Sequence, residues 1–359
     1  MNKTADIGRE FPHNHNSVPS YYIKIWLVLS KLKFILLAMS CSTCPDVQKV
    51  GREEGPCLKM HVKSEMAGYS HVDDDSSLDI FTFDYLETGK LDSYQREKSV
   101  NEGCVSVGSR NGSRLIFICA NGQWLKEDWT IVNSREALDR FRAEIEKEHR
   151  DTPLMTGESI RRGAGIVNIP LEMLSAEIVL NSICCDFRGK GYEGSPLTDV
   201  KVYLTDVNAS CSITTDSLTM PERIINNGGL CIDDMNRMDE PGLLYAVLPS
   251  DLSQARIYPG ISLRCYPNTS PEESPGSPFT KLVIEGQIEG ETYYWPIETG
   301  ASDKAQKHRG IRRNCRYIYD LTITGKGSRD PGTPIRKEDI ELTTYIAPWT
   351  RKDLYTLPY

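Results

Sequence analysis

Short runs of alternating apolar and polar residues recur along the chain and predict β-strands. In the first clear run, Leu58, Met60 and Val62 alternate with two polar residues, which is the period of a strand with one buried face. By the same reasoning, or from short apolar runs, strands are expected at 78–84, 115–119, 130–132, 166–170, 176–180, 200–205, 243–248, 261–265, 281–289, 292–297, 317–323 and 340–346. Gly290 separates two of these runs, which are therefore expected to form a hairpin.

One stretch has a different period. Ser134 is a favourable N-cap residue, and Leu138, Phe141 and Ile145 follow at helical spacing among many charged residues. This pattern predicts one amphipathic helix that packs on a sheet. The polar, glycine-rich stretch 151–164 is expected to connect two domains.

Many short strands with a single helix favour antiparallel β-sandwiches over alternating βαβ units. After removal of a leader (below), about 320 residues remain, which is more than one hydrophobic core usually organises. We therefore expect an all-β chain with an N-terminal β-sandwich at 58–163 and a C-terminal β-sandwich at 164–359. Residues 41–57 are expected to be a tether.

The stretch 31–45 has the pattern of the end of a bacterial lipoprotein leader. Lys31 and Lys33 precede a short apolar run, and the small residue Ser40 precedes Cys41. The run is far shorter than the roughly 20 apolar residues of a membrane-spanning helix. We therefore expect residues 1–40 to be a signal peptide, cleavage between Ser40 and Cys41, and acylation of Cys41. An unmodified Cys41 after an ordinary secretory leader is the alternative.

Composition narrows the choice of partners. The formal net charge of -8 and the pI near 5.4 argue against nucleic acid, because phosphates require basic patches. Charged residues make up 26% and hydrophobic residues 39%, which is ordinary for a folded soluble protein. The 11 cysteines are irregularly spaced. Cys119, Cys184 and Cys265 lie within apolar runs and are expected to be buried thiols.

The sequence contains no pattern typical of an enzyme. It lacks G-x-S-x-G, H-E-x-x-H and a phosphate-binding glycine loop. Four histidines follow the leader, at His61, His71, His149 and His308, and none has a recognisable partner motif. The acidic loop 233–239 lacks the glycine of an EF-hand. We expect no enzyme activity, no cofactor and no metal.

Seven segments, in this order, carry a resemblance to a known family. They are LDIFTFD at 78–84, PLMTGES at 153–159, VNIPLEMLSAEIVL at 167–180, KVYLTDVNASCS at 201–212, TKLVIEGQIEGETYYWPI at 280–297, RNCRYIYDLTITGKGSRDPGTPI at 313–335 and IELTTYIAPW at 340–349. Together with the leader, they resemble the fimbrillins of the type V pili of Bacteroidales. The resemblance covers nearly the whole mature chain.

The resemblance implies two transthyretin-like β-sandwich domains and export as a lipoprotein to the outer membrane and the cell surface. It implies assembly with other fimbrial subunits, as a homopolymer or heteropolymer, into fibres that adhere to a host or bacterial ligand. In polymerising members, a protease cuts after an arginine and frees the first strand. The groove that remains accepts a strand of the next subunit, which is β-strand addition.

Carried onto this chain, the first strand of the acceptor groove contains Leu58, Met60 and Val62. The candidate donor strand contains Ile340, Leu342, Thr344 and Ile346 and continues into the C-terminal tail. The alternative is that 340–346 is simply the last strand of its own sandwich.

One departure from the family pattern concerns cleavage. No arginine lies between Val62 and Leu78, whereas Arg52 precedes the first strand and Arg96 follows the second. A cut at Arg52 would leave the first strand in place. The sequence therefore favours an anchor or accessory subunit over a polymerising shaft fimbrillin, which is the alternative.

The sequence allows two further interpretations, one of a modification site and one of function. Ser217 lies in an Asp216-Ser217-Leu218 triplet that resembles the O-glycosylation site used in these bacteria. A glycan-binding surface lipoprotein, with Tyr293, Tyr294 and Trp295 as an exposed stacking platform, is the alternative function of another class. Because successive residues of a strand alternate between its two faces, part of this trio is expected to be core.

Overall fold

A computed structural model describes residues 57–61, 77–85, 89–97, 104–108, 112–125, 128–162, 166–214, 220–270, 273–300 and 310–348. The chain divides into two units, 1–53 and 54–359. All the described residues lie in the second unit. Within it, the sheets form two groups, which we call the first lobe (the sheets that contain β1 to β5 and β7 to β9) and the second lobe (the sheets that contain β10, β11 and β15 to β20).

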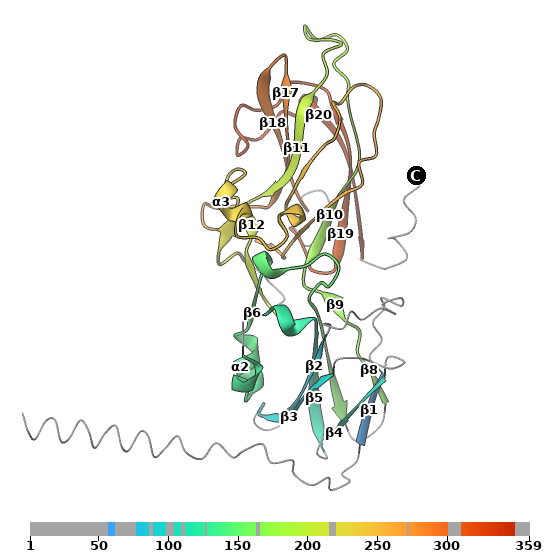
Figure 1. The fold of residues 1–359 in the computed structure, drawn as a ribbon, viewed down its shortest axis with the longest axis vertical. Coiled ribbons are helices and arrows are strands. Elements are labelled where there is room, and N and C mark those ends of the chain that lie inside the picture. Colours follow the sequence, from blue (N-terminus) through green and yellow to red (C-terminus); the bar gives the residue numbers. More distant parts are fainter. Residues whose placement is uncertain are drawn as a thin grey trace, which may run out of the picture. The chain divides into compact units, whose positions relative to one another are not determined.

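The first lobe contains a five-stranded sheet of order β3-β2-β5-β7-β9 and a three-stranded sheet of order β4-β1-β8 (Figure 1). The strands are β1 (Cys57–His61), β2 (Leu78–Asp84), β3 (Leu91–Glu97), β4 (Cys104–Gly108), β5 (Ser113–Ala120), β7 (Met155–Arg162), β8 (Ile166–Asn168) and β9 (Glu172–Met173). Aliphatic residues of both sheets form one buried cluster between them, including Leu78, Ile80, Val105, Val107, Ile116, Ile118, Val167 and Ile169. The two sheets therefore share one core.

The five-stranded sheet is buried on its other face as well. Phe81 and Phe117 lie on that face, and Trp129 covers Phe81 with 5.2 Å between ring centroids. Trp129 in turn stacks on Phe141 at 5.1 Å. Since both faces are covered, β2 is buried at six of its seven positions, including the polar residues Asp79 and Thr82.

The predicted helix begins where expected and ends earlier than expected. The Ser134 hydroxyl accepts the backbone N–H of Ala137 at 3.2 Å and caps α2 (Arg135–Asp139). Phe141 and Ile145 do not lie on this helix. The chain instead forms β6 (Arg142–Glu144), which pairs with β13 (Ser210–Ser212), and then η4 (Ile145–Lys147). The prediction was wrong in length because pairing with a distant strand replaced the helical hydrogen bonds.

Two other local predictions were wrong. The expected strand at 130–132 is replaced by the 3₁₀ helix η3 (Trp129–Ile131), whose N-terminus is capped by the Asp128 side chain at 2.9 Å from the Thr130 nitrogen. The expected connection 151–164 contains β7, which pairs with β5 over eight registers. Gly157 lies within this strand. A side chain there would not fit, because its Cβ would lie 2.1 Å from the Pro170 carbonyl oxygen.

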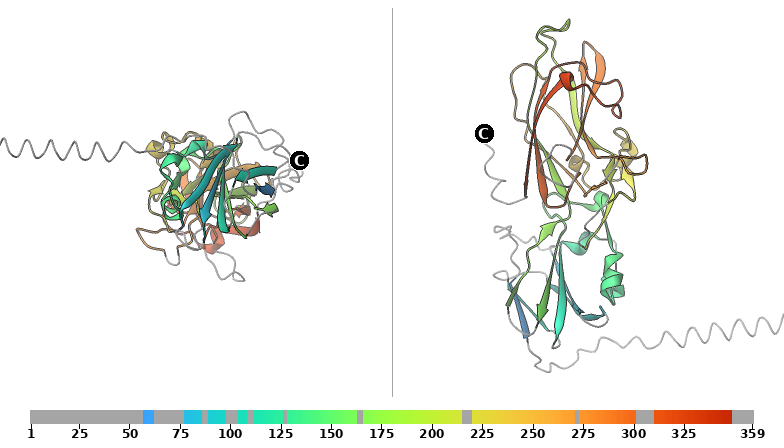
Figure 2. Two further views of the ribbon diagram at one scale, coloured as in Figure 1. Left: turned by 90° about the horizontal axis from the view of Figure 1, so that it is seen from below. Right: turned by 180° about the vertical axis from the view of Figure 1, so that it is seen from behind.

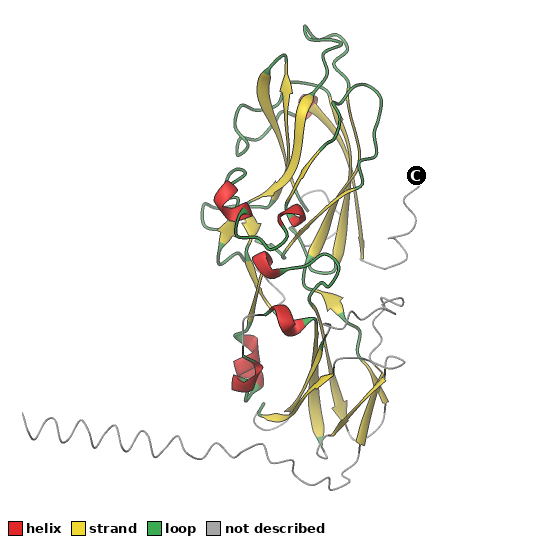
Figure 3. Ribbon diagram, viewed as in Figure 1, coloured by secondary structure: helices red, strands yellow, loops and turns green. Residues whose placement is uncertain are grey.

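The second lobe is a sandwich of two four-stranded sheets, of order β16-β10-β19-β20 and β15-β11-β17-β18. Its strands are β10 (Ala176–Cys185), β11 (Thr198–Thr205), β15 (Tyr245–Val247), β16 (Ile261–Cys265), β17 (Lys281–Ile288), β18 (Glu291–Glu298), β19 (Cys315–Ile323) and β20 (Ile340–Pro348). Shorter elements are η2 (Gly122–Trp124), β12 (Val207–Asn208), β14 (Ile224–Ile225), α3 (Ile232–Met235), η5 (Pro241–Leu243) and η6 (Lys337–Asp339). Strands predominate over helices throughout the described residues (Figure 3).

Several strand predictions in this lobe are confirmed. Tyr317, Tyr319, Leu321 and Ile323 alternate along β19 and are all buried. The hairpin at Gly290 joins β17 to β18, with positive φ angles of 55° at Glu289 and 78° at Gly290. Two successive residues with positive φ are typical of the tight turn that matches the twist of a hairpin.

Each lobe contains a strand with the same kind of surroundings. In the first lobe, β1 lies between antiparallel β4 and parallel β8. In the second lobe, β10 lies between antiparallel β16 and parallel β19. Figure 2 shows the ribbon from two further sides. The sheets are therefore mixed rather than purely antiparallel, within an all-β fold that confirms the predicted class. The predicted domain boundary stays a prediction, because residues 163–165 lie outside the described residues.

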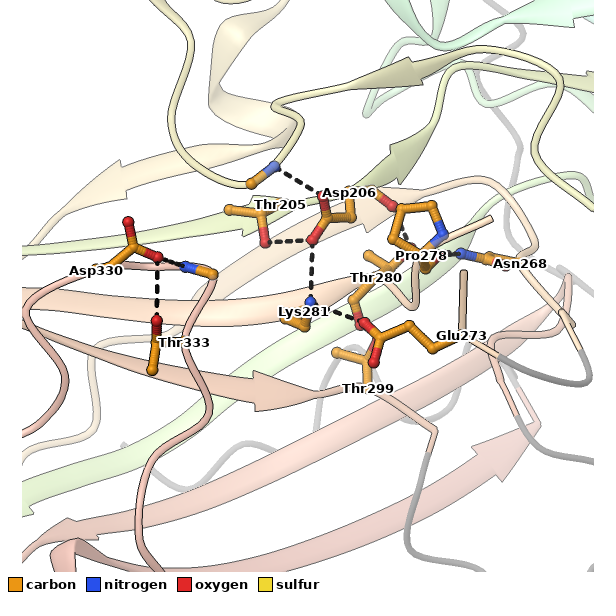
Figure 4. Close-up of polar contacts among 12 residues, drawn as sticks. Thr205, Asp206, Asn268, Glu273, Pro278, Thr280, Lys281, Thr299, Asp330 and Thr333 are labelled. Carbon is orange, nitrogen blue, oxygen red and sulfur yellow. Dashed lines mark hydrogen bonds and ion pairs between the residues drawn. The ribbon is translucent and has the colours of Figure 1, made fainter. Parts of the chain in front are cut away.

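A polar network fixes the loops at one end of the second lobe (Figure 4). Asp206 has a φ of 55° and its side chain is buried. Its carboxylate accepts the backbone N–H of Gly228 at 2.8 Å and lies 3.3 Å from the Lys281 ammonium, which also pairs with Glu273 at 3.0 Å. The Thr280 hydroxyl donates to the Asp206 carbonyl at 2.9 Å. Three loops are thus tied to the start of β17.

The predicted buried thiols are confirmed. Cys119, Cys184 and Cys265 are free and buried. Burial raises the pKa of the Cys265 thiol to about 12. These cysteines act as small core residues rather than as nucleophiles, because only the thiolate is reactive.

Adjacent residues of β18 provide a test of the sandwich. Trp295 is fully buried and its indole donates to the Gly325 carbonyl at 3.1 Å, whereas Tyr294 lies on the opposite face and is half-buried. Trp295→Ala is expected to lower the free energy of unfolding by about 3–5 kcal/mol. Tyr294→Ala, the matched control, is expected to cost clearly less. Urea denaturation measures both, and equal losses would contradict the assignment of faces.

Candidate assembly site

The predicted first strand, β1, lies in the middle of the three-stranded sheet. It pairs with β4 over five registers and with β8 over three. Position 58 is opposite Val107, and position 60 is opposite Val105 and Val167. These valines belong to the buried cluster of the first lobe. The role of β1 as the first strand of an acceptor groove stays a prediction. Val62, also predicted for this strand, lies outside the described residues.

The predicted donor strand, β20, lies at the edge of a four-stranded sheet of the second lobe. It pairs with β19 over nine antiparallel registers. Ile340, Leu342, Thr344 and Ile346 are opposite Ile323, Leu321, Tyr319 and Tyr317 respectively. Cross-strand partners share a face, so these four residues lie on the core side. In this structure the segment completes its own sandwich, and its role as a donor stays a prediction.

The core side of β20 is poorly covered. Leu342 is 43% exposed, while its cross-strand partner Leu321 is 0% exposed. Ile340 and Ile346 are only partly buried against the core. On the other face, Tyr345 is 56% exposed. β20 therefore contributes less apolar burial than β19, and its attachment relies more on backbone hydrogen bonds.

The connection that leads into β20 is held firmly at its base. The backbone N–H groups of Thr324 and Gly325 both donate to the Asp339 carbonyl, at 3.0 and 3.2 Å. Gly325 is required there, because a Cβ would lie 2.2 Å from the Asp339 carboxylate. Arg336 also pairs with that carboxylate at 3.1 Å. The residue before β20 is therefore fixed by both its backbone and its side chain.

Arg96 is engaged in the first lobe and is not an obvious site for a protease. Its Nε lies 2.7 Å and its Nη2 3.1 Å from the two oxygens of Asp79, which is fully buried. The Tyr94 hydroxyl donates to the same carboxylate at 2.8 Å. Burial and the bond to Asp79 raise the pKa of Tyr94 well above its usual range. Arg96 also lies within β3, whereas proteolysis favours loosely held loops. Arg52 lies outside the described residues.

The aromatic trio considered for glycan binding does not form a platform. Trp295 is 0% and Tyr293 is 5% exposed. The Arg329 guanidinium covers the Tyr293 ring at 4.2 Å from its centroid. Only Tyr294 lies on the outer face. The prediction of an exposed stacking surface is therefore wrong. The expectation that part of this aromatic trio lies in the core is confirmed.

Sequence reasoning missed a junction between the lobes. The segment 142–150 leaves the first lobe and pairs with residues 222–240 of the chain. Four ion pairs join the two segments: Arg142–Glu222 at 2.6 Å, Glu146–Arg223 at 2.5 Å, Lys147–Asp239 at 2.7 Å and Arg150–Glu240 at 3.4 Å. Arg223 holds Glu146 with two hydrogen bonds and the pKa of Glu146 is lowered, although its burial opposes this. Partners about 80 residues apart leave no local pattern in the sequence.

The acidic loop and the predicted modification sites are the remaining predicted features. Asp234 and Asp239 of the acidic loop are bound to protein groups, the Asn226 nitrogen at 2.8 Å and the Lys147 ammonium respectively. Within the described part of the chain, no cluster of His, Cys, Asp or Glu could hold a metal ion. The described helices are all too short or too polar to cross a bilayer. Ser40, Cys41 and Ser217 lie outside the described residues.

Comparison with known proteins bears on the class of protein. No family model matches the chain. Its sequence is 24% identical over 360 residues to the major fimbrium subunit FimC of Porphyromonas gingivalis, covering 92% of this chain and 73% of that protein. Its fold is similar to that of a candidate cell adhesion protein from Bacteroides eggerthii, with a TM-score of 0.59, 16% identity and coverage of 82% and 96%. It is also similar to the fimbrilin FimA of Porphyromonas gingivalis, with a TM-score of 0.58, 13% identity and coverage of 82% and 97%.

The two lobes define an all-β protein whose fold is similar to the folds of these two solved proteins. More particularly, the chain is similar in sequence to a fimbrial subunit and in fold to a fimbrilin. The resemblance found in the sequence is confirmed, with the fold that it implied.

The unequal burial of β19 and β20 can be tested with one pair of substitutions. Leu321→Ala is expected to lower the free energy of unfolding by about 2–5 kcal/mol, because it empties a fully buried site. Leu342→Ala, at the register partner, is expected to cost less than half as much, because the side chain is largely in water. Thermal and urea denaturation report both losses. Similar losses would mean that β20 is as firmly packed as β19.

Proposed function

We propose that the chain is an anchoring or accessory fimbrial subunit, tethered to the outer membrane by an acylated Cys41 and joined to neighbouring subunits by β-strand addition. The family supports a role in a cell-surface fimbrium. The observation that carries the proposal is the contrast between β20 and β1. The first is a poorly covered edge strand near the C-terminus, and the second is a strand that fills its own groove.

β20 has the features that a donor strand requires. It presents apolar residues at alternate positions, so backbone hydrogen bonds would supply affinity and the side chains would set the register. Ile340 and Leu342 are two residues apart, as are positions 58 and 60 of β1. A donor that replaced β1 in a related subunit would meet a core like the one beneath Val105 and Val107.

The retained first strand supports a subunit that donates but does not accept. The sequence offers no arginine between Val62 and Leu78. Arg96 is paired with a buried carboxylate in β3. A cut at Arg52 would remove the lipid and leave β1 in place. Such a subunit ends a fibre, since no neighbour can enter its first lobe. A structural role of this kind requires no catalytic centre.

Strand capture separates this proposal from the shaft alternative. The purified protein is mixed with a labelled peptide copying residues 340–359, before and after treatment with an arginine-specific protease. A peptide with Leu342→Asp and Ile346→Asp serves as the control. We expect no specific capture under either condition, because β1 keeps its place. Capture of the unmodified peptide alone after proteolysis would instead identify a polymerising shaft subunit.

Lipid attachment is tested at the two neighbouring cysteines. Metabolic labelling with a fatty acid in a Bacteroidales host is expected to mark the wild-type protein and the Cys44→Ala variant. The Cys41→Ala variant is expected to lose the label and to leave the membrane fraction, because several acyl chains on one cysteine provide the anchor. Labelling that survives Cys41→Ala would overturn the proposed anchor and leave the fold unaffected.

A further inference from the structure

Glu148 is a buried carboxyl group that is bonded to both lobes. Its Oε1 accepts the backbone N–H of Leu154 at 3.2 Å, and Leu154 directly precedes β7 of the first lobe. Its Oε2 accepts the hydroxyl of Tyr266 at 2.9 Å, and Tyr266 directly follows β16 of the second lobe. Glu148 is only 2% exposed. One side chain therefore joins the two lobes.

Other buried carboxylates of this chain have a cation beside them. Arg223 holds Glu146, Arg316 holds Glu177 and Arg96 holds Asp79. No lysine or arginine of the described residues makes such an ion pair with Glu148. An ionised carboxylate that is buried with only two hydrogen bonds is costly. Glu148 thus differs from these buried acids because it makes no direct ion pair with a residue that the structure describes, although the charge of Arg264 partly offsets the rise in pKa that burial causes.

Besides burial, which raises the pKa of Glu148, two charged groups act on it: Arg264 lowers the pKa and Glu240 raises it, and both are also bonded to other groups. From the second lobe, the Arg264 guanidinium donates to the His149 carbonyl at 3.2 Å. On the segment that carries Glu148, the Lys147 ammonium pairs with Asp239 at 2.7 Å. Glu240, on the facing loop, pairs with Arg150.

A small cavity adjoins the carboxyl group. Its volume is about 10 Å³, and Leu125, Ala143, Glu144, Lys147, Glu148, His149, Thr152, Leu154 and Tyr266 line it. This is roughly the space of one water molecule. The cavity has polar groups from both lobes, so water that entered it would compete with the bonds that join them.

We propose that Glu148 is a proton-operated lock between the two lobes. In its protonated form it bridges Leu154 and Tyr266 without a buried charge. In its ionised form it draws water into the adjoining cavity and loosens the junction. The ion pairs of residues 142–150 keep the lobes in contact in both forms, so the lock changes the stiffness of the junction rather than its existence.

The titration of this group falls in the neutral range. Burial is the largest cause that raises the pKa of Glu148, to about 7, and Glu240 adds to the rise. Arg264 and the bonds from Tyr266 and Leu154 oppose it. Because the pKa in the folded state lies above the ordinary value of 4.5 for this group, the stabilisation is complete below pH 4.5. It is lost as the pH rises through about 7.

The first test measures unfolding at two pH values. In the purified protein, Glu148→Gln removes the charge and keeps the shape. At pH 8, we expect the unfolding equilibrium constant of this variant to be roughly 300-fold lower than that of the wild type. Near pH 4.5, we expect little difference. Glu146→Gln, the matched control two residues away, is expected to have the opposite sign at pH 8, because it removes the partner of Arg223. A change of equal size at both pH values for Glu148→Gln would overturn the proposal.

The second test locates the effect and also works on the wild-type protein alone. Backbone hydrogen exchange is compared at pH 6 and pH 8 after correction for the intrinsic rates. We expect added exchange at pH 8 in the segments 145–154 and 262–268, and none in the core strand β10. The Glu148→Gln variant is expected to lose this difference. Exchange that rises evenly through both lobes, or that does not change at the junction, would overturn the lock. Neither result depends on lipid attachment or on fibre assembly.

Discussion

Each lobe depends on a strand that is paired on both of its backbone edges. This strand is β1 in the first lobe and β10 in the second, and each has an antiparallel neighbour on one side and a parallel neighbour on the other. Buried backbone groups need hydrogen-bond partners, so a strand in this position cannot leave unless another replaces it. The two lobes meet this constraint to different degrees. β10 has ten residues and is buried along nearly its whole length, whereas β1 has five. The shorter strand has fewer bonds to lose, and it covers the smaller of the two cores.

The strands of the two lobes differ in how firmly they are held. The firmly held strands, such as β10, β19 and β5, are covered on their faces and paired on both edges. β20 differs, with a partner on one edge and residues such as Leu342 partly in water. Its base at Asp339 is fixed by backbone bonds to Thr324 and Gly325. A rigid base with a loosely packed strand beyond it is the arrangement that a donor segment needs.

The junction between the lobes combines two kinds of contact, exposed ion pairs and the buried hydrogen bonds of Glu148. Exposed ion pairs such as Arg142–Glu222 contribute little each and weaken with salt. The Glu148 contact is buried, so its strength depends on the proton and hardly on salt. A contact that responds to pH there would alter the stiffness of the subunit without altering either sandwich.

The sequence by itself determined the strand content, the fold class and the resemblance to fimbrillins. These signals are local or cumulative, such as the period of two in β11 and β19, the turn at Gly290, and the order of seven family-like segments. It also identified Ser134 as a cap and Cys265 as a buried thiol. Only the tertiary structure decided the short helix α2, the inclusion of β7 in a sheet, and the ion pairs of residues 142–150. In each of these cases the partner is distant in the chain: β13 pairs with β6, β5 pairs with β7, and residues 222–240 supply the opposite charges. The pattern of residues along the chain indicates which face of a segment is apolar. The hydrogen-bond partner of that segment depends instead on which distant segment the fold places beside it.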